Sequence, residues 1–241
     1  MKISVCMATY NGEKFLKEQL DSILSQLSAE DEVVISDDGS TDATLKIIES
    51  YKDKRIHLYH STHKNLILNF ENALKRANGD LIFLSDQDDI WFKDKVEKCT
   101  KQLKKHQLVF SNAAMFKGGN KNDSELFFAN DSKKTGLWNN LYKVNFLGAT
   151  LAFRKSVLEK ALPFPKKIAM HDIWIGLVAE TTGSTHYMDE PLIYYRRHAG
   201  AASTTGSKSE NSLTTKIKIR FKLVVALLRR TLSGRSKSKK G

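Results

Sequence analysis

One short segment constrains the fold of this chain more than any other, because an apolar run passes directly into an acidic one. Residues 81–84 read Leu-Ile-Phe-Leu, and residues 85–91 read Ser-Asp-Gln-Asp-Asp-Ile-Trp. Four consecutive apolar residues followed by polar ones indicate a buried strand that emerges at its carboxyl end. Ligands bind at that end of the strands in an open α/β sheet. The segment therefore predicts both a strand and a ligand site.

Two carboxylates of this segment have a spacing that suits a cation. Asp86 and Asp88 are two residues apart, so in extended backbone their side chains project to one side, about 7 Å apart. The pair repels itself unless a cation lies between, and a hard divalent cation that also binds substrate phosphates meets that need. An acidic turn that caps a helix starting near Phe92 explains the same residues. The segment alone leaves both interpretations open.

Two earlier segments repeat the pattern of a strand that ends in polar residues. An expected strand at 2–8 runs into Thr-Tyr-Asn-Gly at 9–12, and another at 32–36 runs into Asp-Asp-Gly-Ser-Thr-Asp at 37–42. Each loop is followed by a segment with helical character. The three loops gather at one edge if the strands are parallel. They would then form a nucleotide-sized pocket beside the carboxylate pair.

Strands and helices continue to alternate along the chain. The further expected elements are strands at 56–59 and 108–112 and helices at 65–77 and 96–103. This alternation predicts an α/β domain with a doubly wound, mostly parallel sheet. Residues 117–134 are polar and poorly periodic, which indicates an irregular surface excursion. Residues 144–154 are expected to form a strand interrupted by Gly148, where the backbone either approaches a ligand or forms a bulge.

Three motifs together resemble one enzyme family. In order and spacing, residues 8–12, 37–42 and 85–91 are similar to those of family 2 glycosyltransferases with the A-type fold. The Asp-Gln-Asp-Asp-Ile-Trp form resembles the bacterial rhamnosyltransferase-like branch. The resemblance covers roughly residues 1–200. It implies a single Rossmann-like A-type domain and a transferase that uses a nucleotide-diphosphate sugar and a divalent cation, Mn²⁺ or Mg²⁺.

The resemblance also assigns roles to the residues of these motifs. Asp37 is expected to accept a hydrogen bond from the base, because it ends a strand rather than lying inside the turn. Asp86 is expected to contact the ribose or the sugar, and Asp88 the metal. The remaining residues expected to bind the nucleotide sugar are Thr9, Tyr10, Asn11, Asp38 and Gln87.

The second half of the expected site begins at residue 171. In the resembled family an acidic residue at the position of Asp172 is the general base, which removes the proton of the acceptor hydroxyl; a helix cap is the alternative role. Asp172 is the sole acid between Glu159 and Glu180. The residues considered for an acceptor or sugar pocket are Trp91, Gly148, His171 and Trp174. His171 could instead bond to backbone, and Trp174 could belong to the core.

A strand expected at 191–197 leads into another candidate ligand. In related enzymes a histidine after this strand closes over the diphosphate and ligates the metal, and His198 matches that position; a solvated surface histidine is the alternative. Arg196 and Arg197 either neutralise diphosphate charge or form an exposed edge.

The basic character of the chain belongs to its C-terminal segment. Residues 207–241 contain eleven Lys and Arg against one acid, which accounts for +10 of the formal net charge of +12. We therefore expect a catalytic domain at 1–206 and a basic, partly disordered tail at 207–241. Within the tail, apolar residues recur at helical spacing among basic ones. This pattern predicts either a peripheral membrane contact through 214–232 or a helix that packs on the domain.

Composition sets the remaining bounds. A chain of 241 residues with 41% hydrophobic residues suits one large domain with a core. It contains no apolar run long enough for a transmembrane helix. Cys6 and Cys99 have no CxxC partner, which indicates reduced structural thiols. The expected location is the cytoplasm, at the inner face of the cell membrane.

The expected activity is a single displacement that inverts the anomeric configuration. The donor would be dTDP-rhamnose or a UDP-hexose, and the acceptor a lipid-linked glycan of a bacterial surface polysaccharide. A non-catalytic nucleotide-binding scaffold is one alternative. A basic nucleic-acid-binding protein is another, disfavoured because the predicted site is acidic and the basic tail lacks aromatic residues other than Phe221.

Overall fold

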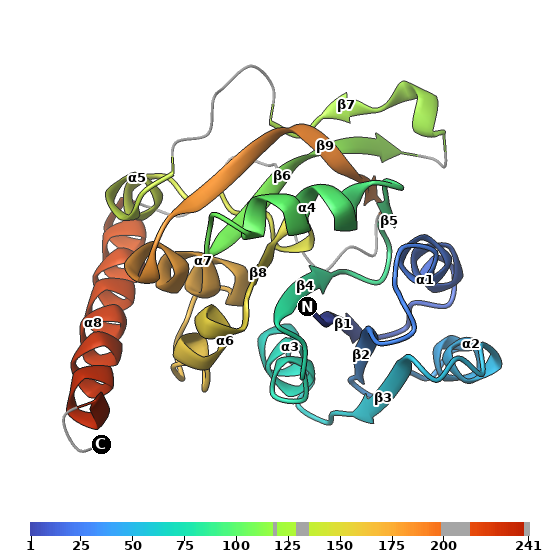
Figure 1. The fold of residues 1–241 in the computed structure, drawn as a ribbon, viewed down its shortest axis with the longest axis horizontal. Helices are drawn as coiled ribbons and strands as arrows, with labels where there is room; N and C mark the ends of the chain where they lie inside the picture. The colour runs from blue at the N-terminus through green and yellow to red at the C-terminus, as the bar shows by residue number, and fades with distance from the viewer. Residues whose placement is uncertain (118–119, 129–134, 199–212, 239–241) are drawn as a thin grey trace.

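A computed structural model of the chain describes residues 1–117, 120–128, 135–198 and 213–238. The strands form one nine-stranded sheet in the order β3-β2-β1-β4-β8-β6-β9-β5, with β7 paired to β6, and helices flank it (Figure 1). The architecture is α/β, as the sequence predicts, and its sheet is mixed, with parallel and antiparallel pairings.

The first half of the chain alternates strictly between strand and helix. Its elements are β1 (Ile3–Thr9), α1 (Leu16–Leu24), β2 (Glu32–Asp37), α2 (Thr44–Ser50), β3 (Ile56–His60), α3 (Leu66–Leu74) and β4 (Leu81–Ser85). All three pairings among these strands are parallel. In the register, Thr9 pairs with Asp37 and Met7 with Ser85. The three polar loops therefore leave the sheet at one edge, as the sequence predicts.

The second half mixes parallel and antiparallel pairings. Its strands and short helical turns are β5 (Ile90–Trp91), β6 (Leu108–Lys117), η1 (Lys121–Asp123), β7 (Glu125–Leu126), η2 (Gly148–Thr150), β8 (Ala152–Arg154) and β9 (Thr185–Arg197). Its helices are α4 (Lys95–Leu103), α5 (Leu137–Tyr142), α6 (Lys155–Ala161), α7 (His171–Thr182) and α8 (Leu213–Ser238). Strand β6 runs parallel to β9, whereas β8 is antiparallel to both β4 and β6.

Alternate residues of the central strands supply two hydrophobic cores, one on each face of the sheet. Val5 and Met7 of β1 join the core that contains residues of α1 and α4. Cys6 and Ala8 of the same strand join the core with residues of α3, α6 and α7. Strands buried on both faces give the continuous apolar runs seen in the sequence. Cys6 and Cys99 are both buried free thiols, as expected.

The strand expected at 144–154 is wrong over most of its length. A 3₁₀ turn, η2, replaces it from Gly148 to Thr150, and only the three residues of β8 are extended. The turn is closed by Thr150, whose N–H and Oγ1 both donate to the carbonyl oxygen of Leu147, at 2.9 and 2.7 Å. Local side-chain bonding of this kind competes with strand pairing. The short helices α5 and α6 are additional elements that the sequence reading missed.

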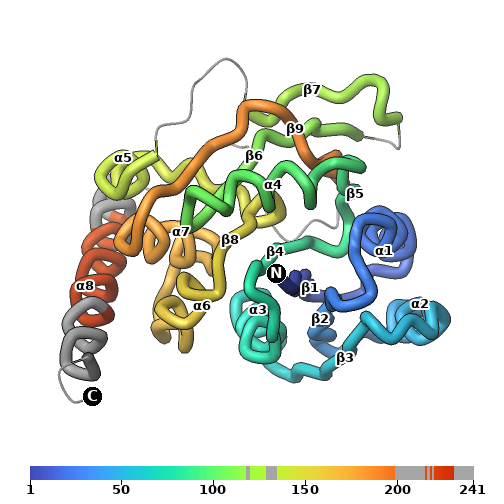
Figure 2. Tube along the Cα trace, viewed as in Figure 1, coloured from blue at the N-terminus to red at the C-terminus, as the bar shows by residue number. Residues whose placement is uncertain are grey.

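The basic tail contains the expected helix, α8, and one side of it packs on the domain. Leu223 and Leu227 are buried in the core that also contains residues of α7. Arg220 Nε donates to the carbonyl oxygen of Leu141 at 2.6 Å, and Arg230 Nη1 donates to that of Leu162 at 2.8 Å. Figure 2 shows α8 along the flank of the domain next to α5. The boundary expected between 206 and 207 lies outside the described residues. None of the described helices has the length and apolarity needed to cross a membrane.

Candidate active site

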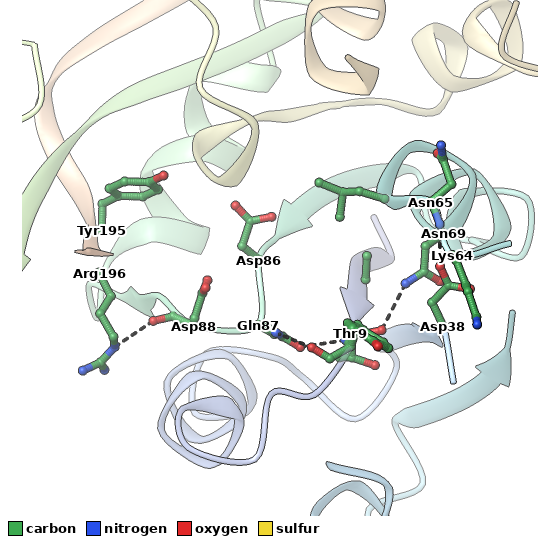
Figure 3. Close-up of a pocket in the computed structure, with 13 residues that line it drawn as sticks. Thr9, Asp38, Lys64, Asn65, Asn69, Asp86, Gln87, Asp88, Tyr195 and Arg196 are labelled. Carbon is green, nitrogen blue, oxygen red and sulfur yellow. Dashed lines mark hydrogen bonds between the residues drawn. The ribbon is translucent and has the colours of Figure 1, made fainter. Parts of the chain in front are cut away.

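A cavity of about 340 Å³ opens at the carboxyl ends of β1, β2 and β4 (Figure 3). It lies where the parallel register brings the polar loops together. Its lining residues are Ala8, Thr9, Tyr10, Asp38, Lys64, Asn65, Leu66, Asn69, Asp86, Gln87, Asp88, Tyr195 and Arg196. Six of the residues predicted to bind donor or metal are therefore at one cavity.

Gln87 joins two of the loops. Its Oε1 accepts from the N–H of Tyr10 at 2.9 Å, and its Nε2 donates to the carbonyl oxygen of Tyr10 at 3.0 Å. A Cβ at Gly12 would collide with this amide, so this pair of hydrogen bonds requires glycine at position 12. The side chain of Gln87 thus fixes the backbone beside the cavity, in addition to lining it.

The two carboxylates that follow β2 have different surroundings. Asp37 is fully buried, does not line the cavity, and accepts bonds from Thr9 Oγ1 at 2.8 Å and Ser40 Oγ at 2.6 Å. Asp38 lines the cavity; its Oδ2 accepts from the N–H of Asn65 at 2.8 Å, and its buried Oδ1 has no hydrogen-bond partner among the described residues. Asp38, and not the Asp37 expected from the sequence, therefore faces the cavity.

Tyr10 and Asn11 lie on the loop after β1. Tyr10 lines the cavity with 55% of its surface exposed. Asn11 is not a lining residue; its φ of 47° lies in the left-handed region, which asparagine tolerates. Asn11 Oδ1 accepts from the N–H of Thr41 at 2.8 Å. In this geometry Asn11 holds the loop after β2 against the loop after β1.

Asp86 carries the clearest electrostatic signature in the cavity. Burial, followed by the charges of Asp88 and Asp172, raises the pKa of Asp86 to about 7, against a partly opposing effect of Lys95. The charge of Asp88 thus acts on Asp86 in the direction that their spacing predicts. The charge of Asp172 also raises the pKa of Asp86. The expected general base therefore interacts electrostatically with a carboxylate that is expected to contact the donor sugar nucleotide.

Asp88 is next to the histidine proposed to ligate the same metal. His198 Nε2 lies 2.9 Å from Asp88 Oδ2. Among the described residues no cluster of three or more His, Cys, Asp or Glu side chains is arranged to hold a metal ion. A carboxylate and an imidazole nevertheless fit a cation whose remaining ligands are diphosphate oxygens and water.

Arg196 is bound into this region rather than lying on an exposed edge. Its Nε donates to the carbonyl oxygen of Asp88 at 2.9 Å, and its Nη2 lies 2.5 Å from Glu18 Oε2. The guanidinium packs between the rings of Phe15 and Phe116, with its carbon 4.7 Å from each centroid. Arg196 thereby ties the end of β9 to the metal-side loop.

Asp172 lies in the first turn of α7, with a half-buried side chain. Its Oδ1 accepts from the N–H of Ile173 at 2.7 Å. Burial raises its pKa to about 6, although the backbone N–H of Gly148 also bonds to the carboxylate and lowers it. A Cβ at Gly148 would lie 3.3 Å from Asp172 Oδ2. At Gly148 the backbone therefore lies close to Asp172, whereas the approach to a ligand stays a prediction.

Three residues considered for an acceptor pocket are buried away from the cavity. Trp174 is fully buried and donates from Nε1 to the carbonyl oxygen of Ala161 at 2.9 Å. Trp91 is buried in the sheet beneath Lys95. His171 stacks on Phe70 with centroids 4.0 Å apart, and burial lowers its pKa to about 3, so its ring is neutral. All three support the site from the core.

A buried lysine is the main site residue that the sequence reading missed. Lys95 is fully buried, and its Nζ donates to the carbonyl oxygen of Ala149 at 2.8 Å and lies 4.6 Å from the Trp91 ring. Burial lowers its pKa to about 8, against the attraction of Asp86 and Asp89. The signal in the sequence was the position of this lysine, which lies four residues before Cys99 on the apolar face of α4.

The other missed residues come from α3, from the two residues before it and from β9. Asn65 caps α3 by accepting from the N–H of Leu68 at 3.1 Å, and Asn69 Nδ2 donates to the carbonyl oxygen of Thr9 at 3.1 Å. The Oδ1 of Asn69 is buried without a partner among the described residues. Lys64 and Tyr195 complete this wall. An asparagine pair at i,i+4 on a helix face next to a predicted site was the signal.

Known proteins resemble this chain in sequence and in fold. The family model described as glycosyl transferase family 2 matches residues 4–162. The dTDP-rhamnosyl transferase RfbG of Shigella flexneri is 32% identical over 80% of this chain and 71% of its own length. The UDP-Glc:alpha-D-GlcNAc-diphosphoundecaprenol beta-1,3-glucosyltransferase WfaP of Escherichia coli is 27% identical over 86% and 81%, respectively.

A solved structure shares the fold. The crystal structure of S. aureus TarS 1–349 in complex with UDP-GlcNAc has a TM-score of 0.67 at 22% identity, over 97% of this chain and 73% of that one. Together, the family model, the relatives and the architecture show that this chain belongs to glycosyltransferase family 2 and is a transferase.

Proposed function

We propose that this protein transfers a sugar from a nucleotide-diphosphate donor to a glycan hydroxyl, with inversion at the anomeric carbon. The observation that carries the proposal is the cavity at the carboxyl ends of β1, β2 and β4, with Asp86 and Asp88 in its wall and Asp172 in their electrostatic neighbourhood. Thr9, Tyr10 and Asp38 would contact the nucleoside. The unpartnered oxygen of Asp38 is an acceptor for a donor group on the base or ribose.

Asp88 and His198 would hold the divalent cation, Mn²⁺ or Mg²⁺. Their polar atoms are 2.9 Å apart, so one ion could replace the hydrogen bond between them. When bound, the ion supplies Lewis-acid stabilisation for the charge of the departing diphosphate. Arg196 fixes the backbone of Asp88 and the end of β9 on which His198 follows.

Asp172 would be the general base. With its pKa at about 6 it is ionised at neutral pH and still basic enough to take a proton. In the proposed step the acceptor oxygen forms a bond to the anomeric carbon while the bond to the diphosphate oxygen breaks. The hydroxyl proton goes to Asp172. A single displacement of this kind inverts the configuration.

The substrates are proposed from the relatives. RfbG is named for dTDP-rhamnose and WfaP for UDP-glucose and a diphosphoundecaprenol-linked acceptor. We infer a donor of one of these two classes and a lipid-linked glycan acceptor, in the synthesis of a bacterial surface polysaccharide at the cytoplasmic face of the membrane. A catalytically silent nucleotide-binding scaffold is the alternative.

A panel of nucleotide sugars tests the proposal. Thermal unfolding is measured with dTDP-rhamnose, UDP-glucose and UDP-GlcNAc, each with and without Mn²⁺, since a ligand that binds the native state raises the melting temperature. We expect one donor to give a metal-dependent shift and slow metal-dependent release of free sugar. A shift without any release or transfer would favour the scaffold; no shift with any donor would contradict donor binding.

A further inference from the structure

Two neighbouring helices on one flank of the domain carry unusually exposed aromatic side chains. Trp138 and Tyr142 of α5 are 80% and 82% exposed, and Phe221 of α8 is 68% exposed. Trp138 and Tyr142 are four residues apart in a helix, so they lie on one face. Large exposed aromatic groups that gather on one surface mark interaction sites.

The two helices are held together, which brings Phe221 close to the end of α5 that carries Tyr142. Arg220 donates from Nε to the carbonyl oxygen of Leu141 at 2.6 Å and from Nη2 to that of Tyr142. Phe221 therefore follows directly on the residue that joins the two helices. The inner side of α5 is also anchored on the domain, because Asn140 is fully buried and donates to Glu180 Oε1 at 2.9 Å.

The described charged side chains on and directly after these two helices have one sign. Lys143, Lys218 and Lys222 are exposed beside them. Neither α5 nor α8 contains an acidic residue in its sequence. Such a surface is complementary to a layer of negative charge above an apolar phase. Trp and Tyr, which combine an apolar ring with a polar group, concentrate at the boundary between lipid and water.

We propose that the aromatic–basic surface, defined as Trp138, Tyr142, Phe221, Lys143, Lys218 and Lys222, docks on an anionic lipid bilayer. The aromatic rings enter the headgroup region while the lysines contact lipid phosphates. The surface extends the contact expected from the tail sequence: the buried side of α8 packs on the domain, and α5 supplies two of the three aromatic anchors.

The location of this surface suits an acceptor that is carried on lipid. Helix α7, whose first turn holds Asp172, packs against both α5 and α8, as Figure 1 shows. The bilayer would then lie beside the C-terminal part of α7, to which α5 bonds through Glu180, while the proposed general base is in the first turn of the same helix. This orientation rests on the proposed function, whereas binding of the surface to lipid does not.

A second copy of this chain is the rival occupant. Pairing two such surfaces would bring their lysines towards each other, with no carboxylate on either helix to compensate. The charge pattern therefore favours an anionic lipid surface over self-association.

Vesicle co-sedimentation of the full chain tests the proposal. The vesicles are phosphatidylcholine alone or with about one third phosphatidylglycerol, and W138A/Y142A/F221A is compared with the parent protein. We expect the parent to bind the anionic vesicles at low salt and to be released at high salt. The aromatic variant should lose roughly tenfold in partitioning. Each of Lys143→Ala, Lys218→Ala and Lys222→Ala should lose up to about fivefold.

Matched variants separate this surface from general charge and stability effects. K101A/K104A/K105A removes three exposed lysines from the α4 region, and Leu126→Ala removes an apolar side chain of β7 that is 49% exposed. Both should bind vesicles like the parent protein. All variants should keep the parent melting temperature and the parent rate with a soluble acceptor.

Three results would overturn the proposal: no binding of the parent to anionic vesicles, undiminished binding of the aromatic variant, or a dimer by sedimentation that the aromatic variant converts to monomer. Vesicle binding without any sugar transfer would leave the proposal intact and count against the proposed function instead.

Discussion

The donor half and the acceptor half of the site are built in different ways. Up to Ser85 the strands are parallel, and each donor loop simply continues a strand to the same edge of the sheet. Beyond it, Asp172 depends on the turn η2, whose Gly148 lies against its carboxylate, whereas His198 follows β9, which pairs with β6 and β5. The residues proposed to bind donor and metal are therefore placed by strands of the sheet, and the proposed general base by contacts between elements.

This comparison predicts that substitutions in the two halves fail differently. Changes at donor-half residues that face the cavity should remove metal or donor binding and leave the fold intact. Changes in the acceptor half should reduce the chemical step while the donor still binds.

The largest effect is expected for Asp88→Ala. Loss of the carboxylate removes a proposed metal ligand, and the stabilisation of the leaving group with it, so turnover should fall by roughly 10³-fold. Metal titration of the activity checks this, and the rate that remains should not respond to Mn²⁺. The melting temperature should not fall, because Asp88 adds to the repulsion in the cavity. Normal activity with unchanged metal dependence would remove Asp88 from the metal site.

Asp172→Asn should lower kcat by about 10²-fold or more, the scale of a lost general base, with the affinity for donor unchanged. The parent enzyme should lose activity as the pH falls through about 6, because the folded-state pKa is raised and protonation removes the base. A pH profile of kcat/KM for both proteins tests this, and the variant should lack that acidic limb. If Asp172→Asn abolished donor binding instead, Asp172 would be structural.

Lys95→Met should lower the free energy of unfolding of the protein, because Lys95 interacts with residues of both halves of the site. The substitution keeps much of the side-chain volume but removes the cation that faces Asp86 and Asp89 and the bond to Ala149. Removing one partner from buried charges costs about 3 kcal/mol. Urea denaturation measures this, with the exposed Lys101→Met as control. Equal stability of both variants would show that Lys95 is not a counter-charge.

The smallest expected effects distinguish the roles of Asp37 and Asp38, the two carboxylates that follow β2. Asp38→Asn should weaken donor binding by about tenfold, the value of one hydrogen bond to a charged group, with little change in unfolding. Asp37→Asn should lower the melting temperature, because its carboxylate holds the loop through Thr9 and Ser40. Calorimetry of donor binding and thermal unfolding distinguish them. Weakened donor binding in Asp37→Asn, with unchanged donor binding in Asp38→Asn, would make Asp37 the donor contact instead.

The donor half could be predicted from the sequence because its signals are local. Apolar runs that end in polar loops identify β1, β2 and β4, and parallel pairing places Thr9, Asp38 and Asp86 together. The choice between Asp37 and Asp38 could not be made this way, because it depends on which side chain the turn directs inwards.

The acceptor half depends on individual contacts, some local and some distant in sequence, that leave no periodic pattern. The turn η2 replaces an expected strand because of side-chain bonding within three residues. Lys95 is 54 residues from its partner Ala149. The burial of His171 and Trp174 follows from the packing of α7 on α3 and α6. None of these is a periodic signal.

The stereochemistry of the product tests the central claim most directly. The claim is that Asp172 and the donor cavity together perform one displacement at the anomeric carbon. Proton NMR of the glycoside product, with the donor identified by the thermal-shift panel, reads the anomeric configuration of the new linkage, which is fixed once it has formed. The account predicts inversion relative to the donor. Retention of the donor's configuration would contradict it.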